Sequence, residues 1–226
     1  MDKLWYLKKI DLFEAMESKE MDFINSHSTM KNFNKNEIIY EINETENIYL
    51  IKKGKVKLYK ISEQGKEFTY SILKENELFG NLDIKNNTGS ENAQSISDCM
   101  VCVINKNIFL DFMKRKPHLI LKINQMMGLR KYEMEMLLED IVFKNVEQRF
   151  YSILLRLYEK FGIDMENNQK KIDIKLTHYD ISTLLGATRE VTSIIISKLK
   201  KENLIICKNK NIIIKNYEFI KQKLNM

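Results

Sequence analysis

The stretch Leu176–Asn203 constrains the fold more than any other part of the chain. Apolar residues recur in it at helical spacing on both sides of Gly186, which predicts two short helices joined by a tight corner. Thr177 followed three residues later by Asp180 predicts a capping box, and the hydroxyl of Thr188 can cap the second helix. These features together predict a helix-turn-helix.

The second of these helices begins with polar side chains that the pattern directs away from the core. The expected apolar faces are Ile181, Leu184 and Leu185 in the first helix, and Val191, Ile195 and Leu199 in the second. In a helix-turn-helix, the N-terminal end of the second helix meets base edges in the major groove. Arginine suits guanine and glutamate suits cytosine. The expected outward-facing residues are therefore Arg189, Glu190, Thr192 and Ser193.

The positive charge of the chain is concentrated around this motif. Residues 1–143 contain 21 Lys and Arg against 22 Asp and Glu, whereas residues 144–226 contain 16 against 9, giving net charges of −1 and +7. Arginine is scarce, with five in the chain against 32 lysines, which makes Arg189 more informative. A basic C-terminal part is expected of a domain that binds a polyanion. The plain alternatives are a solvated lysine-rich face and a helical hairpin inside an unrelated core.

The first half of the chain predicts a small β-domain. Residues 10–30 have a helical pattern, after which the apolar period changes to two. The expected strands are Ile38–Tyr40, Tyr49–Lys53, Lys55–Ile61, Phe68–Leu73 and Met100–Ile104, with turns at Lys53-Gly54, Gln64-Gly65 and Asn76-Glu77. Short strands this close in sequence favour an antiparallel sandwich or roll.

A long helix is expected after Pro117. Apolar residues from Leu119 to Val142 alternate at spacings of three and four, which is the seam of a two-stranded coiled coil. The expected dimer seam comprises Ile120, Ile123, Met127, Arg130, Met134, Leu137 and Ile141. The alternative is a helix that packs against its own sheet. A homodimer is favoured by the length of the seam, and it suits a reader of symmetric DNA.

The seam is interrupted at Phe143–Asn145, which marks the expected hinge and domain boundary. Another amphipathic helix is expected over Val146–Phe161, followed by a polar loop at Glu166–Lys171. After the helix-turn-helix, β-rich runs on both sides of Asn209-Lys210 predict a hairpin, and the whole is a winged helix-turn-helix. Lysines that would lie near phosphates are Lys208, Lys210 and Lys215.

The expected fold class is therefore α+β. Its three parts are an N-terminal antiparallel β-roll sensor with an N-terminal helix at residues 1–115, a long dimerisation helix at 116–143, and a C-terminal winged helix-turn-helix at 144–226. No apolar run has the length of a membrane span, and the N-terminal residues lack the hydrophobic region of a signal peptide. With only three cysteines, this favours a soluble cytoplasmic protein with reduced thiols. An enzyme is not expected, because no phosphate-binding glycine loop or metal-ligand spacing occurs.

Several motifs are shared with one protein family. They are YLIKKGKVKLYK at Tyr49–Lys60, Gly65-Lys66-Glu67, Leu78-Phe79-Gly80, VFKNVEQRF at the hinge and GATREV at Gly186–Val191. With them, and in the order of its elements, the chain resembles the CRP/FNR superfamily of bacterial transcription regulators over nearly its full length. The resemblance implies a homodimer in which a cyclic nucleotide-binding-like roll senses a signal. It also implies winged domains that reorient to bind a palindromic site in double-stranded DNA, and RNA polymerase as a further partner.

Departures from the family motifs bear on the signal. Relatives that bind cyclic AMP follow Phe-Gly with Glu, and hold the cyclic phosphate with an Arg-Ser-Ala motif. Here Asn81 follows Gly80, and the Arg-Ser-Ala positions read Glu91-Asn92-Ala93. A carboxylate there would repel the phosphate, so we expect that cyclic nucleotides are not the ligand. The expected effector pocket, which includes the long-helix positions that contact adenine in those relatives, comprises Gly80, Asn81, Glu91, Asn92, Met134 and Glu135.

Two other cofactors of the family can be weighed from the sequence. The iron-sulfur branch needs a cysteine cluster ahead of the first helix, which this chain lacks. Cys99 and Cys102 are three apart in a strand and should face opposite ways, and with Cys207 they are interpreted as core residues, a thiol switch being the alternative. Haem is bound in some relatives through histidine or methionine, and His27 and His118 keep that alternative open.

At the DNA surface, the resemblance assigns base reading to Arg189, Glu190 and Ser193. The next reading position is an arginine in many relatives but Ile194 here, which could touch a thymine methyl and should change the half-site. The candidates for phosphate contacts are Thr177, His178, Thr188 and Thr192.

The leading hypothesis is a dimeric, sequence-specific transcription regulator, switched by a signal other than cyclic AMP through a change in dimer arrangement about Phe143–Asn145. The alternatives are a haem-binding gas or redox sensor of the same family, and a ligand-binding protein whose winged domain contacts an acidic protein partner.

Overall fold

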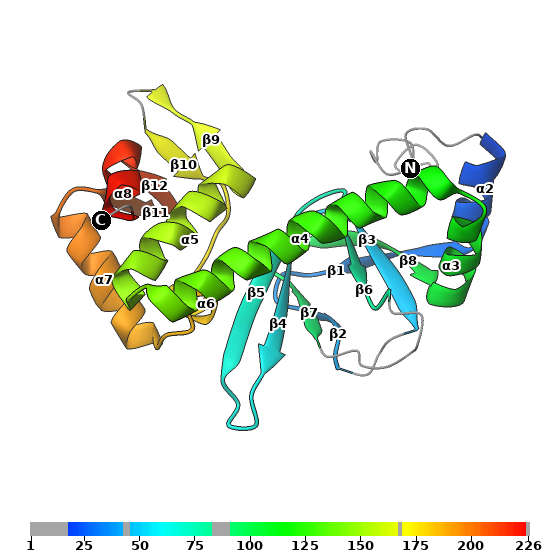
Figure 1. Cartoon of the computed structure of the whole chain (residues 1–226), viewed down its shortest axis with the longest axis horizontal. Helices are drawn as coiled ribbons and strands as arrows, with labels where there is room; N and C mark the ends of the chain where they lie inside the picture. The colour runs from blue at the N-terminus through cyan, green and yellow to red at the C-terminus, as the bar shows by residue number, and fades with distance from the viewer. Residues whose placement is uncertain (1–17, 43–45, 83–90, 167–168, 225–226) are drawn as a thin grey trace. The chain divides into compact units, whose positions relative to one another are not determined.

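The computed structural model describes residues 18–42, 46–82, 91–166 and 169–224 (Figure 1). Their architecture is α+β, as predicted. The chain divides into two compact units. The first holds the described residues up to Lys60 together with Tyr70–Glu133, and the second holds Ile61–Thr69 together with the described residues from Met134 onward. The division between them therefore falls inside the long helix.

The described residues of the N-terminal half form two four-stranded sheets, with strand orders β1-β8-β3-β6 and β2-β7-β4-β5. The strands are β1 (Ser28–Phe33), β2 (Ile38–Tyr40), β3 (Asn47–Lys53), β4 (Val56–Ile61), β5 (Glu67–Leu73), β6 (Leu78–Gly80), β7 (Asn92–Ser95) and β8 (Cys99–Asn105). The five predicted strands are confirmed. Three more were missed, because β6 has only three residues, β7 is mostly polar, and β1 begins where a helix was expected to continue to residue 30. The helix itself, α2, covers Ser18–Ser26, and the earlier part of its predicted range lies outside the described residues.

Strand β8 is shared between two hydrophobic clusters, one on each of its faces. Cys99, Val101 and Val103 pack in one cluster, whereas Cys102 and Ile104 pack in the other. The prediction that the two cysteines face opposite ways is therefore confirmed. It follows from the period of two along a strand.

The long helix α4 covers Pro117–Phe143 and follows the shorter α3 (Lys106–Lys114). Two residues of the predicted dimer seam face the β-roll instead. Ile123 packs against the core cluster that contains Leu119, and Arg130 donates from its Nη2 to the carbonyl oxygen of Leu78 at 2.7 Å. The spacing of apolar residues was right for a helix, but it could not separate the face that meets the roll from the face that remains open.

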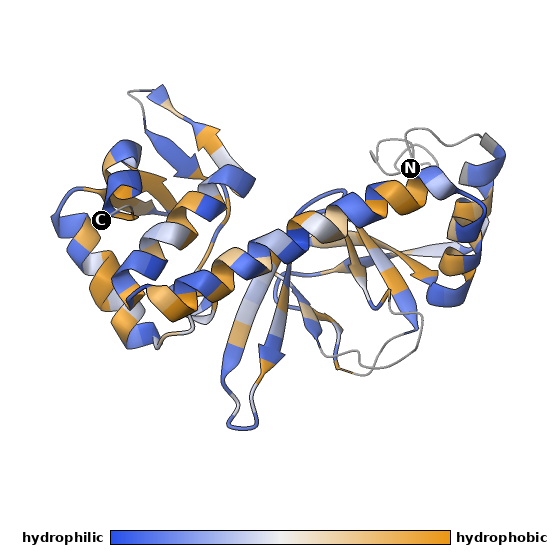
Figure 2. Ribbon diagram, in the orientation of Figure 1, coloured by the Kyte–Doolittle hydropathy of each residue, from blue (hydrophilic) through white to orange (hydrophobic). Residues whose placement is uncertain are grey.

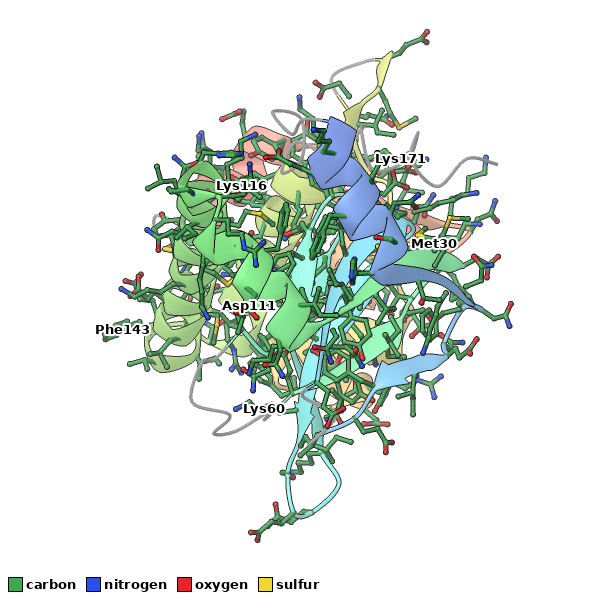
Figure 3. All side chains as sticks on the ribbon, turned by 90° about the vertical axis from the view of Figure 1, so that its right-hand side faces the viewer. Met30, Lys60, Asp111, Lys116, Phe143 and Lys171 are labelled. Carbon is green, nitrogen blue, oxygen red and sulfur yellow. The ribbon has the colours of Figure 1, made fainter. Side chains whose placement is uncertain are left out.

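Many large apolar side chains remain exposed on α4, a helix along which Figure 2 shows hydrophobic and hydrophilic residues in alternation. Large apolar side chains that remain exposed are Ile120, Leu121, Leu129, Tyr132, Met134, Leu138, Ile141, Val142 and Phe143. Phe143 is 80% exposed and extends away from the ribbon at the end of the helix (Figure 3). Three residues of the predicted seam are therefore exposed, whereas Met127 and Leu137 are half-buried.

The C-terminal unit contains the helices α5 (Val146–Phe161), α6 (His178–Leu185), α7 (Arg189–Lys201) and α8 (Tyr217–Leu224). Its sheet has the order β11-β12-β10-β9, formed by β9 (Gly162–Asp164), β10 (Lys170–Ile172), β11 (Ile205–Lys208) and β12 (Asn211–Ile214). The predicted hairpin is present as β11 and β12, and Asn209 and Lys210 both have positive φ angles, as a type I′ turn requires. The predicted loop at Glu166–Lys171 was partly wrong, because β10 begins at Lys170.

A buried carboxylate joins the end of α4 to α5. Asp140 is 1% exposed, and it forms ion pairs with Lys144 at 2.7 Å and with Arg156 at 2.5 Å. The hydroxyl of Ser152 also donates to Asp140, at 3.1 Å. Asn145 caps α5 in a capping box with Gln148. These contacts lie on both sides of the predicted hinge at residues 143–145, so a rotation there has to break them.

Candidate nucleic-acid interface

The helix-turn-helix forms from the residues that predicted it. The side chain of Thr177 accepts from the backbone N–H of Asp180 at 3.1 Å, and the Asp180 carboxylate accepts from the N–H of Thr177 at 2.7 Å. Gly186 ends α6 in the left-handed conformation, with φ of 61°. Thr188 caps α7 by accepting from the N–H of Val191 at 3.3 Å. The capping roles of both threonines are thus confirmed.

The buried face of α7 keeps two of its three predicted residues, Ile195 and Leu199. Thr192, Ile195, Ile196 and Leu199 are buried, whereas Val191 is 38% exposed. Thr192 is 0% exposed, and its hydroxyl donates to the carbonyl oxygen of Thr188 at 2.9 Å. The predicted phosphate contact of Thr192 is therefore wrong, because its side chain supports the first turn of α7 from inside.

The opposite face of α7 is exposed and carries the predicted base-reading residues. Arg189, Glu190 and Ile194 are exposed, with Ile194 at 67%, and Ser193 is half-buried beside them. Ser197 and Lys201 extend the same face and were missed by the sequence analysis. Helical spacing could have predicted them, because Ser197 follows Ile194 and Ser193 by three and four residues and Lys201 follows Ile194 by seven. A groove of about 510 Å³ runs over this face, lined by Ser193, Ile194, Ser197, Lys198, Lys201 and Glu202.

His178, which was predicted to contact a phosphate, lies against Ser193, which was predicted to contact a base. Nδ1 of His178, the first residue of α6, is 2.8 Å from the hydroxyl oxygen of Ser193 in α7. Both side chains are half-buried, so each keeps a part of its surface open to solvent. The structure thus brings together two residues that are 15 positions apart.

The lysines of the winged domain differ in whether their ammonium groups are exposed or already paired. Lys208 and Lys210 are exposed on the hairpin, whereas the ammonium group of Lys215 donates to the side-chain oxygen of Asn203. Lys198 forms an ion pair with Glu147 of α5 at 2.7 Å. That hydrogen bond holds the pKa of the Glu147 carboxyl below its usual value. Lys208 and Lys210 are therefore better placed for phosphates than Lys215 or Lys198.

In the β-roll, the predicted effector residue Glu91 is part of a hydrogen-bonded cluster. Its two carboxylate oxygens accept from the hydroxyls of Tyr40 in β2 and Tyr70 in β5. Burial first, and then the adjacent Glu91 charge, raise the pKa of both tyrosines well above the ordinary value. The two tyrosines were missed, because they lie 51 and 21 residues from Glu91 and no local pattern connects them.

The neighbouring effector candidates have structural contacts of their own. The side-chain oxygen of Asn92 accepts from the N–H of Ile42 at 3.1 Å. Gly80 has φ of 103°, and a Cβ there would lie 2.7 Å from the carbonyl oxygen of Asn47. Asn81 is half-buried beside it. Met134 and Glu135 are exposed on α4 and belong to the other compact unit, so their part in a pocket remains a prediction.

The cysteines have the surroundings of core residues. Burial raises the pKa of the Cys99 and Cys207 thiols, which lowers the fraction present as reactive thiolate. The thiol of Cys99 also donates to the carbonyl oxygen of Lys55 at 3.2 Å. Among the residues that the structure describes, no three His, Cys, Asp or Glu side chains gather in a way that could hold a metal ion.

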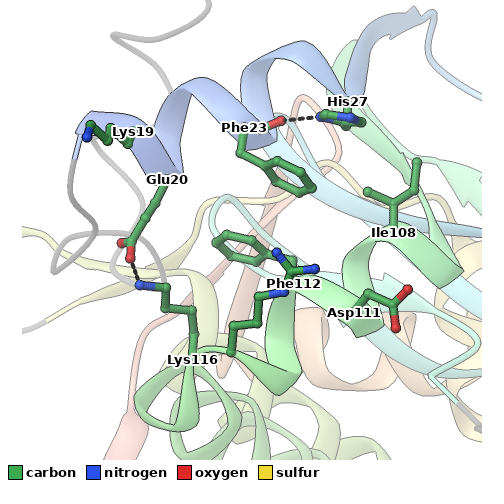
Figure 4. Close-up of a pocket in the computed structure, with 9 residues that line it drawn as sticks. Lys19, Glu20, Phe23, His27, Ile108, Asp111, Phe112 and Lys116 are labelled. Atoms are coloured by element: carbon green, nitrogen blue, oxygen red, sulfur yellow. Dashed lines mark hydrogen bonds and ion pairs between the residues drawn. The ribbon is translucent and has the colours of Figure 1, made fainter.

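A separate pocket of about 410 Å³ lies between α2, α3 and the residues Arg115 and Lys116 that follow α3 (Figure 4). Phe23 stacks on His27 and on Phe112, with ring centroids 4.2 and 5.4 Å apart, and Glu20 forms an ion pair with Lys116 at its edge. Nδ1 of His27 is 2.9 Å from the carbonyl oxygen of Phe23. His118, the other histidine considered for haem, is exposed on α4. Charged side chains line this pocket together with the apolar side chains of Phe23, Ile108 and Phe112. Haem binding stays a prediction.

No helix in the described part of the chain combines the length and the apolar character needed to cross a membrane.

Comparisons with known proteins identify both halves of the chain. Residues 30–116 match the cyclic nucleotide-binding domain family, and residues 148–222 match the Crp-like helix-turn-helix domain family. The global nitrogen regulator of Synechocystis sp. is 29% identical over 182 residues, which cover 79% of this chain and 80% of that protein. The fumarate and nitrate reduction regulatory protein of Yersinia pestis is 29% identical over 180 residues, covering 79% of this chain and 71% of that protein.

The fold is also found among solved structures. A CooA variant from Carboxydothermus hydrogenoformans matches with a TM-score of 0.80 at 22% identity, covering 96% of this chain and 97% of that chain. The matched families and relatives are DNA-binding transcription regulators rather than enzymes. The chain belongs to the CRP/FNR family of transcription regulators.

Proposed function

We propose that this regulator acts as a homodimer that reads a palindromic DNA site through Arg189, Glu190 and Ser193 of α7. The observation that carries the proposal is that these residues share the exposed N-terminal part of α7, while its opposite face is buried in the winged domain. Arg189 supplies the bidentate donors that suit guanine, and Glu190 is an acceptor for the amino group of cytosine. Ile194 offers an apolar contact to a thymine methyl, so the half-site differs from one read by arginine at that position.

The proposed dimer forms along α4. The exposed apolar residues Ile120, Met134 and Leu138 share one side of the helix by their spacing, and Leu138 is 61% exposed in the single chain. Exposed apolar side chains gathered in this way are typical of an interface between proteins. Pairing of two such helices gives two reading helices related by a two-fold axis, which matches a palindromic site. The proposed division is a sensor at residues 1–115, a dimerisation helix at 116–143 and a DNA-binding domain at 144–226.

The signal that we propose for the β-roll is not a cyclic nucleotide. Glu91 stands at the position where relatives that bind cyclic AMP carry a phosphate-binding arginine, and its carboxylate is held by two tyrosine hydroxyls. A cyclic phosphate placed there would meet a negative charge of the same sign in a partly buried environment, which disfavours binding. The signal would act by favouring one arrangement of the dimer over another.

The proposal is tested by selecting duplexes from a random pool with the purified full-length chain. We expect an inverted repeat to be enriched, with two chains bound to each duplex. The affinity should fall with salt, because lysines near phosphates release counterions. A preference for an acidic protein partner over every duplex, or equal binding of all sequences, would contradict the proposed function. Addition of RNA polymerase to the selected complex would then test whether the polymerase is a direct partner.

A further inference from the structure

The contact between His178 and Ser193 joins a residue proposed to contact a phosphate to a residue proposed to contact a base. Ser193 has a hydroxyl that can donate one hydrogen bond and accept others, so by itself it does not choose between bases. Nδ1 of His178 lies 2.8 Å from that hydroxyl oxygen, and no other hydrogen bond of the Ser193 side chain is present among the described residues. The histidine therefore decides what the serine can offer to a base.

The two tautomers of a neutral histidine have opposite consequences. If Nδ1 carries the lone pair, it accepts the Ser193 proton, and the serine oxygen can only accept from a base. If Nδ1 carries the proton, the serine proton is free to be donated to a base. Adenine N6 and cytosine N4 are amino donors in the major groove, whereas N7 of both purines, guanine O6 and thymine O4 are acceptors. A serine that can only accept therefore selects adenine or cytosine, and a serine that is free to donate loses that preference.

A phosphate contact fixes that tautomer. His178 is the first residue of α6, and it is half-buried. A phosphate oxygen accepts hydrogen bonds but has none to donate, so a contact with Nε2 requires the proton on Nε2 and the lone pair on Nδ1. In that state Ser193 is an acceptor.

We propose that His178 is the positioning residue for Ser193, and that a backbone phosphate, His178 and Ser193 form a chain of hydrogen bonds that makes Ser193 select adenine or cytosine. The inference rests on the proposed function, since it assumes that α7 reads a DNA site. It adds a determinant of base preference that does not itself touch a base.

The test measures the affinity of the full-length chain for the selected site with each of the four bases placed opposite Ser193. That base position is identified as the one at which Ser193→Ala no longer distinguishes the four bases. The wild-type chain should favour adenine or cytosine there by about 3- to 10-fold, the size expected for one hydrogen bond. His178→Arg can still donate to the phosphate but cannot accept from Ser193. It should keep overall affinity while the preference for adenine or cytosine is lost, because the serine proton is then free for an acceptor on guanine, thymine or adenine.

Two controls separate positioning from a merely structural role. In a Ser193→Ala background, His178→Arg should leave the base preference unchanged, because the side chain through which it acts is missing. The ¹⁵N chemical shifts of the His178 ring in the complex should show Nε2 protonated and Nδ1 not.

Three results would overturn the inference: an unchanged preference in His178→Arg, an equal loss of affinity for all four bases, or a wild-type preference for guanine or thymine. If the wild-type chain shows no preference for any sequence, the proposed function fails instead, and the two failures are therefore distinguishable.

Discussion

The winged domain and the β-roll differ in how their candidate functional residues are brought together. In the winged domain, Arg189, Glu190 and Ser193 lie within five positions on one helix, so helical period alone puts them on one face. In the roll, Glu91 meets Tyr40 and Tyr70 from distant strands. The proposed reading residues are thus brought together by local structure, whereas the proposed sensor residues are brought together by the register of the whole sheet.

The largest effect is expected from the surface that brings two reading faces together. Leu138→Asp places a charge on the exposed apolar face of α4, and it should convert the dimer to single chains. Loss of the second half-site should then reduce affinity for the inverted repeat by about 100-fold or more. Sedimentation velocity and titration of the duplex measure the two effects. Exposed Lys131→Asp on the same helix is the matched control, and a dimeric Leu138→Asp that binds normally would contradict the proposed interface.

The next largest effect concerns the reading face itself. Arg189→Ala should weaken binding to the selected site by about 10- to 100-fold, because a bidentate contact to guanine is lost. The change should relax discrimination at one position and leave the thermal midpoint unaltered, since Arg189 is exposed. Lys210→Ala provides the control, with weaker binding to all sequences and a salt slope reduced by about 1. An equal loss on selected and scrambled duplexes for Arg189→Ala would show that it contacts phosphate only.

In the β-roll, the expected effect is on stability and ionisation rather than on DNA. Glu91→Gln removes the carboxylate that accepts from two tyrosines, and it should cost about 1–3 kcal/mol of unfolding free energy. Because the Glu91 charge is one cause of the raised pKa of Tyr40 and Tyr70, both pKa values should fall, while burial keeps them above the ordinary value. Denaturant titration measures the loss of stability. An unfolding free energy that is unchanged in Glu91→Gln would show that the hydrogen bonds are not made.

The smallest effect is a pH dependence in the winged domain. The folded-state pKa of Glu147 is depressed by Lys198, so the pair contributes stability above the unfolded-state pKa and loses it as pH falls through the folded-state value. Glu147→Gln should therefore flatten the decrease in unfolding free energy on the acid side. Denaturant titrations at neutral and acid pH measure it, with Glu202→Gln on the neighbouring surface as the control. Parallel pH profiles for wild type and Glu147→Gln would contradict the assignment.

The sequence predicted the elements that have a strong local pattern. The two capped helices around Gly186 and the strand that carries Cys99 and Cys102 were expected, because period and capping are local properties. Thr192 was misplaced, since a threonine is read as polar although its hydroxyl can be satisfied by the helix carbonyl one turn earlier. Ile123 and Arg130 were assigned to a dimer seam, because the period of a helix does not say which neighbour each face meets.

The role of long-range contacts explains the remaining gaps. The pair His178 and Ser193, the cluster around Glu91 and the ion pairs of Asp140 all join residues that no single pattern contains. Asp140 also restricts rotation at the expected hinge. Because Asp140 links α4 to Arg156 of α5, the last turns of α4 are tied to the winged domain, and any rotation at residues 143–145 has to break buried ion pairs.

The measurement that most directly tests the account is the dependence of affinity on the spacing between the two half-sites of the selected inverted repeat. A dimer with two reading helices on one side of the duplex requires half-sites about one helical turn apart, which is roughly 10 base pairs. An insertion of half a turn should rotate the second half-site to the opposite side and reduce affinity to that of a single half-site. Equal affinity for the inserted and the original duplex would contradict the paired reading of DNA.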